Sequence, residues 1–451
     1  MDLICRDIMM QSNVLGFQPT GLGFIAEMKY VGGAYHTRRA SGYGICLDSS
    51  NNIYVSGAFD NGSYSNAYLA KLNNTGTPQW QKQFVSSLTS SILTRVTTDG
   101  TDMYAGGSQG GDPIWIKFNT SGTVSWYKTN SGGGTVWGLE YNSYSGGRLK
   151  TLTDDYPVGL RFFDLNTSGS VASSFGEKLI DNTTLTGSHF INNVGGFATS
   201  TGGTDPTYNA TAYYEYEGGV STPVLYSMRD DGADFWAREI ASTSSSGGMY
   251  IGCTYGYDYT AYTRPSLFAC GTWGSSPRKA FLTKYNGTGT IQWQRRLDGG
   301  YGGRWSSVVC DSSTNIYVVG KYENSSGDEI MMIAKYNSSG TLQWQRTITH
   351  SQGFDLAPQY VIHDGSTLYI TGFLLESSSY NSLMIFKLPD DGSLTGTYGK
   401  YTYAASSLTA STPSVTSQSN SVSSVSASLG TYNEYGFVPS SITFNQTFTA
   451  L

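Results

Sequence analysis

The stretch Lys335-Tyr-Asn-Ser-Ser-Gly340-Thr-Leu-Gln-Trp344 decides the fold of this chain, because close copies of it recur along the sequence. In each full copy a lysine precedes an Asn- and Gly-containing segment, and a tryptophan follows the last glycine by four residues. A turn of this composition between two strand-like segments is typical of an antiparallel hairpin. Full copies occupy residues 71–80, 117–126 and 284–293, and worn copies occupy 165–171 and 387–394.

A second repeated phrase lies upstream and reads, in its best copies, Asp-Ser-Ser-x-Asn-Ile-Tyr-Val-x-Gly. It occupies residues 48–57 and 311–320, with related versions at 99–107 and 364–372. The interval from Gly57 to Gly107 is 50 residues, and the intervals along Gly271, Gly320 and Gly372 are 49 and 52 residues. Self-similarity at this period indicates a repeat fold with one supersecondary unit per repeat.

One complete unit, residues 305–347, divides into four strand-like segments that are rich in β-branched and aromatic residues and separated by turn residues. These segments are 305–310, 316–320, 330–335 and 341–347. Four-stranded antiparallel units of about 40–50 residues are the sequence sign of propeller blades. The sequence therefore predicts an all-β protein with a single β-propeller over residues 24–400.

Counting second strands gives the number of blades. They lie at Gly57, Gly107, 149–153, 196–200, Gly271, Gly320 and Gly372, which is seven. The third and fourth units are degenerate, so six or eight blades stay open as alternatives. The interval of about 75 residues between the fourth and fifth units predicts an insertion within about 203–263.

The N-terminal segment 24–30 stands at the spacing of a fourth strand but has no first three strands of its own, and residues 1–23 form an arm before it. A ring protein uses such an orphan strand to pair with its last blade and remove an open edge. We therefore expect residues 24–30 to pair near residues 383–388.

The C-terminal tail, residues 401–451, is rich in Ser and Thr and carries a single charge, Glu434. Near its end Ile442, Phe444 and Phe448 alternate with polar residues, as in a one-faced strand. Two interpretations stay open: the tail attaches the protein to a partner, or it folds back on the propeller as closing β-strands.

Composition limits the classes of function. Charged residues make up 13% of the chain, Gly (56) and Tyr (34) are abundant, and the net charge is −6. No basic stripe is available to neutralise phosphates, so we expect no nucleic-acid partner. The first ten residues lack the apolar core of a signal peptide, and apolar runs such as 330–334 are too short to span a bilayer.

Five cysteines form an odd set without a CxxC pair, which favours buried free thiols over a disulfide or metal site. They are Cys5, Cys46, Cys253, Cys270 and Cys310. The surface composition looks adhesive, yet we see no export signal. A virion protein, made in the host cytoplasm and released by lysis, reconciles these observations.

The units resemble the bacterial and phage β-propeller repeat family, whose consensus runs Asp-x-x-Gly/Asn-Asn-x-Tyr-Val-x-Gly, then Ala-Lys-Tyr/Leu-Asn-x-x-Gly, then Trp. Segments 48–57, 70–80, 311–320 and 334–344 carry the match best, and it is weak across 140–260. Units of this kind are common in tailed phages. The resemblance therefore implies a structural or tail-associated protein, and it supplies no catalytic residues.

Catalytic and metal-binding patterns do not emerge from the sequence. The paired carboxylates at 154–155, 230–231 and 390–391 are interpreted as turn residues, although a glycosidase needs two carboxylates that face one bond. The four histidines are scattered without a pair at ligand spacing. The loops of the 48–52 type lack the downstream glutamate of a dedicated calcium loop. We therefore expect no enzyme activity, no cofactor and no metal.

Tyrosines concentrate in and around the expected insertion, with Gly, Ser and Thr between them. Tyrosine presents a rigid amphipathic face that suits recognition of glycans or proteins, although alternating tyrosines are equally explained as strand positions. The candidate ligand-binding residues are Tyr255, Tyr257, Tyr259, Tyr262 and Trp236.

Together these observations predict a non-enzymatic phage virion protein, associated with the tail or capsid, that binds proteins or a host surface. Its expected partners are other virion proteins, reached through the C-terminal tail, and a host-surface glycan or protein. The alternative is a bacterial surface or secreted carbohydrate-binding propeller.

Overall fold

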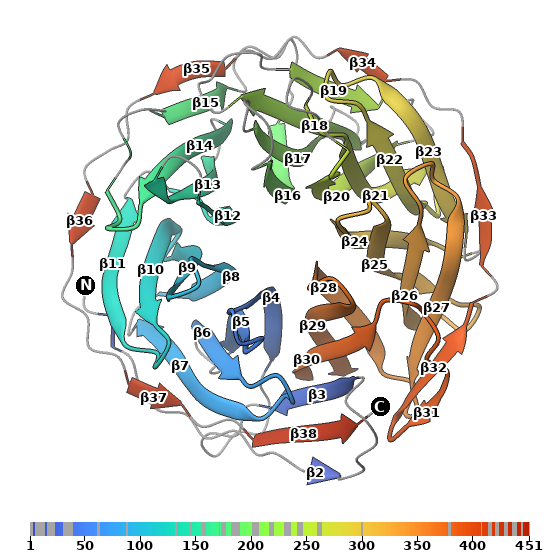
Figure 1. Cartoon of the computed structure of the whole chain (residues 1–451), viewed down its shortest axis with the longest axis horizontal. Coiled ribbons are helices and arrows are strands. Elements are labelled where there is room, and N and C mark those ends of the chain that lie inside the picture. Colours follow the sequence, from blue (N-terminus) through green and yellow to red (C-terminus); the bar gives the residue numbers. More distant parts are fainter. Residues whose placement is uncertain are drawn as a thin grey trace. The chain divides into compact units, whose positions relative to one another are not determined.

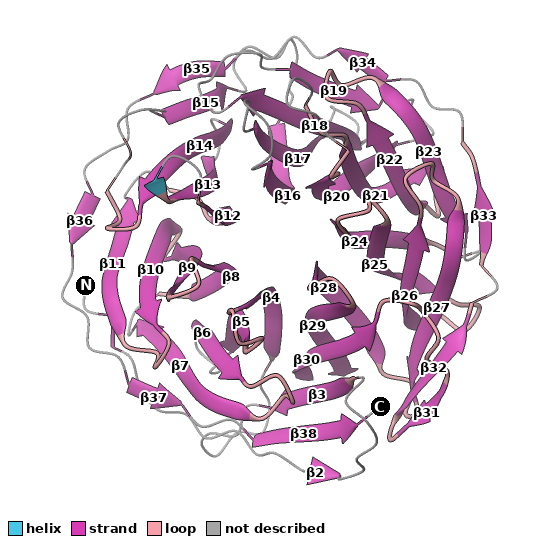
Figure 2. Cartoon of the chain, in the orientation of Figure 1, coloured by secondary structure: helices cyan, strands magenta, loops and turns pink. Residues whose placement is uncertain are grey.

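The structure, a computed structural model, describes most of the chain. The described residues are 3–4, 14–15, 23–29, 39–60, 64–86, 89–130, 133–143, 146–155, 159–170, 172, 177–181, 190–200, 207–215, 221–229, 236–240, 247–258, 264–298, 301–377, 380–406, 408–413, 417–419, 424–427, 432–434, 440–442 and 445–450. Strands dominate this part of the chain (Figure 2).

The protein is an all-β propeller with seven four-stranded antiparallel blades, as the sequence predicts (Figure 1). Blade 1 contains β4 (Ala40–Leu47), β5 (Ile53–Asp60), β6 (Ser65–Leu72) and β7 (Pro78–Ser86). Blade 2 contains β8 (Ser91–Thr98), β9 (Asp102–Gln109), β10 (Asp112–Asn119) and β11 (Val124–Asn130). Blade 3 contains β12 (Val136–Asn142), β13 (Arg148–Asp155), β14 (Gly159–Asn166) and β15 (Glu177–Asp181). Blade 4 contains β16 (Phe190–Ser200), β17 (Thr207–Glu215), β18 (Ser221–Arg229) and β19 (Trp236–Ile240).

The remaining blades follow the same order. Blade 5 contains β20 (Gly247–Tyr255), β21 (Leu267–Gly274), β22 (Lys279–Tyr285) and β23 (Ile291–Asp298). Blade 6 contains β24 (Gly303–Cys310), β25 (Ile316–Glu323), β26 (Glu329–Tyr336) and β27 (Leu342–His350). Blade 7 contains β28 (Asp355–His363), β29 (Thr367–Ser377), β30 (Tyr380–Pro389) and the N-terminal strand β3 (Phe24–Lys29).

The chain divides into two compact units. The first comprises Met1–Tyr141, Ile348–Ala404 and Gly430–Leu451, and the second comprises Asn142–Thr347 and Ala405–Leu429. Blades 1, 2 and 7 belong to the first unit, and blades 4 and 5 belong to the second. Residues from both ends of the chain therefore belong to the same compact unit.

The repeated glycines have a steric cause. A Cβ on Gly320 would lie 2.0 Å from the carbonyl oxygen of Arg304, where the first strand of the blade carries an irregularity between Trp305 and Ser307. A Cβ on Gly340, which has a φ of +77°, would lie 2.8 Å from the indole of Trp293 on the preceding blade. Both positions admit only glycine without movement of the neighbouring chain.

The apolar core lies between neighbouring blades. In the first unit Tyr54 and Phe84 of blade 1 pack in one cluster with Leu93 and Ile116 of blade 2, and all four are buried. In the second unit residues of blades 5 and 6, including Phe268 and Trp305, form an equivalent cluster. In these pairs, two blades of the same unit bury their apolar faces against each other, which a single blade cannot do alone.

Strand β3 confirms the expected closure of blade 7. It pairs antiparallel with β30, with Phe24 opposite Lys387 and Met28 opposite Leu383. The buried carboxylate of Glu27 accepts a hydrogen bond from the hydroxyl of Tyr401. This contact joins the two ends of the chain within the first unit.

The described parts of the C-terminal tail form short strands on the blades. They are β31 (Gly396–Tyr398), which begins just before the tail, β32 (Tyr401–Ala405), β33 (Thr409–Ser411), β34 (Ser417–Ser419), β35 (Ser424–Ala427), β36 (Tyr432–Glu434), β37 (Ser440–Ile442) and β38 (Asn445–Ala450). In chain order, β33 to β38 pair with β23, β19, β15, β11, β7 and β3. Figure 1 shows β38 beside β3, for example. Of the two interpretations of the tail, the structure contains the one in which it folds back on the propeller.

The N-terminal arm, residues 1–23, contributes two short strands. Strand β1 (Leu3–Ile4) pairs with β7, and β2 (Val14–Leu15) pairs parallel to β38. Both belong to the first unit.

The stretch 203–263 corrects the expected insertion. Strands β17, β18 and β19 of blade 4 and β20 of blade 5 fill most of it. The segment 196–200, taken as a second strand, belongs to the first strand β16, which is why the interval to Gly271 seems too long. The regular blade plan therefore continues through this stretch.

Candidate functional site

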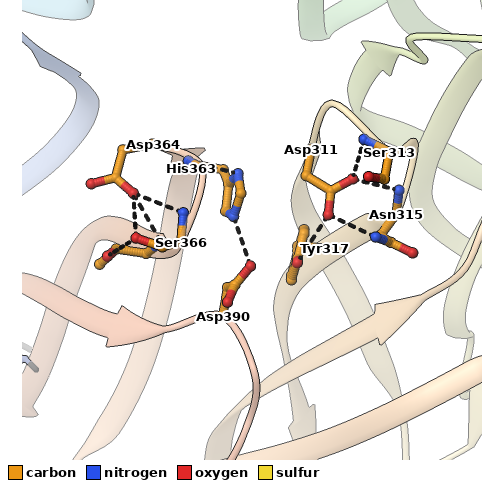
Figure 3. Close-up of polar contacts among 10 residues, drawn as sticks. Asp311, Ser313, Asn315, Tyr317, His363, Asp364, Ser366 and Asp390 are labelled. Atoms are coloured by element: carbon orange, nitrogen blue, oxygen red, sulfur yellow. Dashed lines mark hydrogen bonds and ion pairs between the residues drawn. The ribbon is translucent and has the colours of Figure 1, made fainter.

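The repeated aspartates organise the hairpin between the first and second strands of a blade. The Oδ1 atom of Asp311 accepts hydrogen bonds from the backbone N–H groups of Ser313 (2.9 Å) and Asn315 (2.8 Å). Its Oδ2 atom accepts hydrogen bonds from the Asn315 amide (2.7 Å) and the Tyr317 hydroxyl (3.3 Å), as Figure 3 shows. All these donors come from the same hairpin, so the motif is a turn motif.

The same arrangement recurs at the other intact turns. Asp364 accepts a hydrogen bond from the backbone N–H of Ser366 (3.1 Å; Figure 3). It also accepts hydrogen bonds from the backbone N–H of Thr367 (2.9 Å) and from the hydroxyl of Tyr369 (3.0 Å). Asp48 and Asp99 make equivalent bonds within their own turns. The hairpin interpretation of the 48–52 type loops is therefore confirmed.

Three of the turn carboxylates, those of Asp48, Asp99 and Asp311, have pKa values below the usual range and are therefore ionised near neutral pH. Burial acts to raise the pKa of Asp311, but hydrogen bonds from Asn315, Ser313 and Tyr317 outweigh it, so the pKa lies below its usual range. The pKa values of Asp48 and Asp99 are lowered in the same way. Conversely, burial and the adjacent carboxylate raise the pKa of Tyr54. Neither partner therefore exchanges a proton near neutral pH.

The lysine of the repeat completes this polar cluster on the third strand. The Nζ atoms lie above the rings of the second-strand tyrosines, with Nζ–centroid distances of 4.8 to 5.6 Å. The pairs are Lys71–Tyr54, Lys117–Tyr104, Lys335–Tyr317 and Lys387–Tyr369. Cation–π contacts of this kind stabilise partly buried cations, so the lysine has a structural use in the blade.

The fourth-strand tryptophan fastens one blade to the next. The indole N–H of Trp80 donates to the carbonyl of Thr120 (2.9 Å), and that of Trp293 donates to the carbonyl of Ser338 (3.1 Å). Trp236, predicted to bind a ligand, occupies the same position in blade 4 and donates to the carbonyl of Gly287 (3.2 Å). Its indole is therefore engaged in packing between blades 4 and 5.

Blade 7 also contains a histidine–carboxylate pair, next to the turn of Asp364. The Nε2 atom of His363 lies 3.0 Å from a carboxylate oxygen of Asp390, while Nδ1 accepts the backbone N–H of Gly365 at 3.2 Å (Figure 3). With Nδ1 as the acceptor, the ring proton sits on Nε2 and points at the carboxylate. Both ring nitrogens are thus engaged by groups of blade 7 itself.

Blade 5 contains an aspartate that the repeat pattern does not reveal. Asp258 accepts hydrogen bonds from the backbone (2.9 Å) and hydroxyl (2.6 Å) of Ser266, and its carboxylate lies 3.1 Å from Nζ of Lys284. The loop between β20 and β21 is longer than the other turns, which moves this aspartate out of the repeat spacing. The contact with a third-strand lysine and the hydrogen bond from a backbone N–H relate it to the turn aspartates.

Blades 3 and 4 share a buried charged cluster that sequence reasoning also missed. Nζ of Lys150 lies 3.0 Å from Asp164 and 2.9 Å from the hydroxyl of Tyr208, which also donates to Asp164. The side chains of Asp164 and Lys150 are 0% and 5% exposed. A cluster closed to solvent cannot meet a substrate, so its role is to hold the two blades together.

The structure brings together two of the predicted ligand-binding tyrosines. The ring centroids of Tyr255 and Tyr257 lie 5.6 Å apart, and Tyr257 is 44% exposed. Its backbone N–H donates to the hydroxyl of Thr314 (2.9 Å). Tyr259 and Tyr262 lie outside the described residues.

The structure also tests the predictions for the cysteines and for the paired aspartates. Cys46, Cys253, Cys270 and Cys310 are free thiols, and the last three are buried, which confirms the prediction for those positions. Asp391 accepts two hydrogen bonds from Ser393 and is a turn residue, as expected. Asp154 and Asp155 instead lie at the end of strand β13, because its pairing with β14 continues to Asp155.

Two findings are confined to the described residues. They contain no group of three or more His, Cys, Asp or Glu side chains placed to hold a metal ion. Within the same ranges, no helix is long and apolar enough to cross a membrane.

Comparisons with known proteins return only distant structural likeness. No family model and no curated protein matches the chain. A protein of unknown function from Dyadobacter fermentans aligns over 85% of this chain and 98% of its own, with 8% identity and a TM-score of 0.43.

Two further structures are provisionally named 6-phosphogluconolactonases. The one from Bacteroides fragilis has 10% identity and a TM-score of 0.38 over 72% of this chain and 95% of its own. The one from Bacteroides uniformis has 12% identity and a TM-score of 0.39 over 80% and 94%. At these values the likeness concerns the fold alone, and no activity is inferred from it.

Proposed function

We propose that this protein is a non-enzymatic structural protein of a phage virion, a propeller that binds other virion proteins or a host surface. One observation carries the proposal: the repeat's polar residues are consumed by the fold. Asp311 and Lys335 bind their own blade, and Trp293 binds the next blade. What is left for function is the surface that the blades display.

The low charge of the chain supports a role in contact formation. Only 13% of residues are charged, so much of the surface can be buried against a partner without stripping water from ions. Tyr257 and Tyr301 are 44% and 54% exposed, and such rings are favoured anchors at binding surfaces. The resemblance of the repeats to those of tailed phages is the reason for proposing a virion location.

The C-terminal tail provides sheet edges for attachment within this proposal. Strands β33, β34, β35 and β36 each stand last in the order of their sheets. A partner strand can add to such an edge through backbone hydrogen bonds. Cutting the chain after Lys400 should therefore abolish incorporation into particles, and particles that still contain the truncated protein would exclude this route.

Labelling of virions tests the proposal. An antibody against the recombinant propeller should bind purified phage particles from the source culture in negative-stain electron microscopy. Absence of both label and peptide from purified virions would refute the virion role. If the protein is absent from virions and binds to a glycan array, the alternative is favoured, namely a carbohydrate-binding propeller that is secreted or displayed on a bacterial surface.

A further inference from the structure

Blades 5 and 6 line a cavity of about 210 Å³ that is open to solvent and contains none of the repeated aspartates, lysines or tryptophans. Arg278 lies in the loop between β21 and β22, Arg304 on β24, and Tyr322 on β25. Backbone hydrogen bonds from Gly303 to Arg278 (2.9 Å) and from Glu323 to Gly302 (3.2 Å) fix the surrounding chain. We propose that this cavity binds the carboxylate of a small acidic sugar.

Two buried polar atoms at the cavity lack a partner. Nε of Arg304 and Oγ1 of Thr272 are buried and make no hydrogen bond to any described residue. Both residues line the cavity, and Thr272 is 7% exposed. Unsatisfied buried polar groups cost free energy, so a side-chain rotation that turns either group toward an acceptor in the cavity would relieve that cost.

The charges that line the cavity favour a monoanion. Lys321 and Glu329 form an ion pair with each other. Their charges cancel, and the remaining charged groups at the cavity are Arg278, Arg304 and Glu323, with a net charge of +1 (two cations minus one carboxylate). One carboxylate neutralises this excess, whereas a phosphate dianion would exceed it beside two glutamates. The forked guanidinium of arginine also matches a carboxylate in geometry.

The remaining lining favours a ligand with a carbon skeleton. Tyr322 and Met249 supply apolar surface next to the charged groups. The volume is below the roughly 300–1,000 Å³ of pockets for drug-sized ligands, which suits a single sugar residue. Apolar walls with a few convergent polar groups are the usual form of a small-molecule site.

The site itself is independent of where the protein is located. Only the identification of its natural ligand as an acidic residue of a host-surface glycan rests on the proposed function. If the virion-labelling experiment fails, a host-surface glycan is no longer expected as the natural ligand. The prediction that the cavity binds a soluble acidic sugar is unaffected by that result.

Titration of the full-length protein with sodium glucuronate tests the inference, by calorimetry and by ligand-observed NMR. Glucuronate should bind, acetate should bind more weakly because it lacks the sugar body, and glucose should not bind because it lacks the carboxylate. The substitution Arg304→Gln should weaken glucuronate binding about tenfold or more, as expected for a lost charged hydrogen bond.

Arg346→Gln is the matched control. Arg346 lies on β27 and also has a buried Nε without a described partner, but it does not line the cavity. Its substitution should leave binding unchanged. If Arg304→Gln does not fold, Arg278→Gln provides the same test from a loop. Equal binding of glucose and glucuronate, tighter binding of inorganic phosphate, or unchanged binding by a folded Arg304→Gln protein would each overturn the proposal.

Discussion

Blade 3 and blade 6 use the same chemical groups at the same sheet positions but distribute them differently. In blade 6, second-strand Tyr317 lies opposite third-strand Lys335, and the turn aspartate accepts the tyrosine hydroxyl. In blade 3, Lys150 occupies the tyrosine position and lies opposite Asp164. The tyrosine that donates to Asp164 is Tyr208, which comes from the second strand of blade 4 and not from blade 3.

The difference changes what the groups stabilise. The cluster of blade 6 lies at a partly exposed hairpin and holds one turn, whereas that of blade 3 is buried and ties two blades. In blade 7 the fourth strand itself, β3, comes from the N-terminal region of the chain. Blades that use distant parts of the chain should therefore respond more strongly to mutation than blades with a complete local motif.

Removal of β3 should have the largest effect. Deleting residues 1–31 exposes the edge of β30 and removes the contact of Glu27 with Tyr401, so we expect the melting temperature to fall by roughly 10 °C or more. Deleting only residues 1–22 keeps β3 and should cost far less. Differential scanning calorimetry of both proteins measures this, and equal melting of the 1–31 deletion and the full chain would contradict it.

The buried cluster of blade 3 should follow in size. Asp164→Asn leaves Lys150 buried without its counterion, which should lower the free energy of unfolding by about 3–5 kcal/mol. Urea unfolding measures the change. Replacing both residues, as Lys150→Met with Asp164→Leu, should recover part of the loss, since no buried lysine is then left without a counterion. Arg148, which also pairs with Asp164, is 21% exposed and can be solvated. A loss below about 1 kcal/mol for Asp164→Asn would show that the cluster is not a lock.

The turn of blade 6 should be less sensitive. Asp311→Asn keeps an acceptor oxygen but loses the charge at a partly exposed site, so we expect a loss of about 1 kcal/mol in urea unfolding. The lowered pKa of Asp311 means that its contribution is present above its unfolded pKa, about 3.9, and is lost as pH falls through the lower folded value. The stability of Asp311→Asn should therefore fall less steeply below about pH 4 than that of the wild type. Identical acid limbs for the two proteins would argue against this role.

The smallest expected effect is the difference in stability between two substitutions of fourth-strand tryptophans. Trp293→Phe removes the hydrogen bond to Ser338 and should cost about 1 kcal/mol beyond the loss of ring contacts. Trp344 is the matched control, because its indole N–H is buried without a partner among the described residues. Trp344→Phe should cost less, since it also removes an unsatisfied donor. Chemical denaturation compares the two, and the reverse order would contradict this role of the Trp293 hydrogen bond.

The sequence by itself determined the features that depend on consecutive residues. Five repeated glycines and two degenerate segments predict seven blades, with six or eight as alternatives, and the structure contains seven. The turn aspartates were recognised as turn residues because their partners lie within six positions along the chain. The orphan strand β3 was recognised because strand spacing in a repeat is itself a local measure.

Only the tertiary structure decided the features whose partners are distant in sequence. Asp164 of blade 3 accepts its hydrogen bond from Tyr208, which lies 44 positions away, so no local motif in the sequence reveals this contact. The units of blades 3 and 4 also lack the clear repeat motif, which is why the sequence places segment 196–200 in a second strand and the structure places it in a first strand. The tail pairs through backbone groups, which any extended segment offers, so its composition left two interpretations open. The cavity of blades 5 and 6 likewise gathers Thr272, Arg304 and Lys321 from three strands. The hydrogen bonds of a turn depend on neighbouring residues, so the sequence predicts them. The hydrogen-bond partners of buried groups and of strand edges depend on which distant strands the fold brings together.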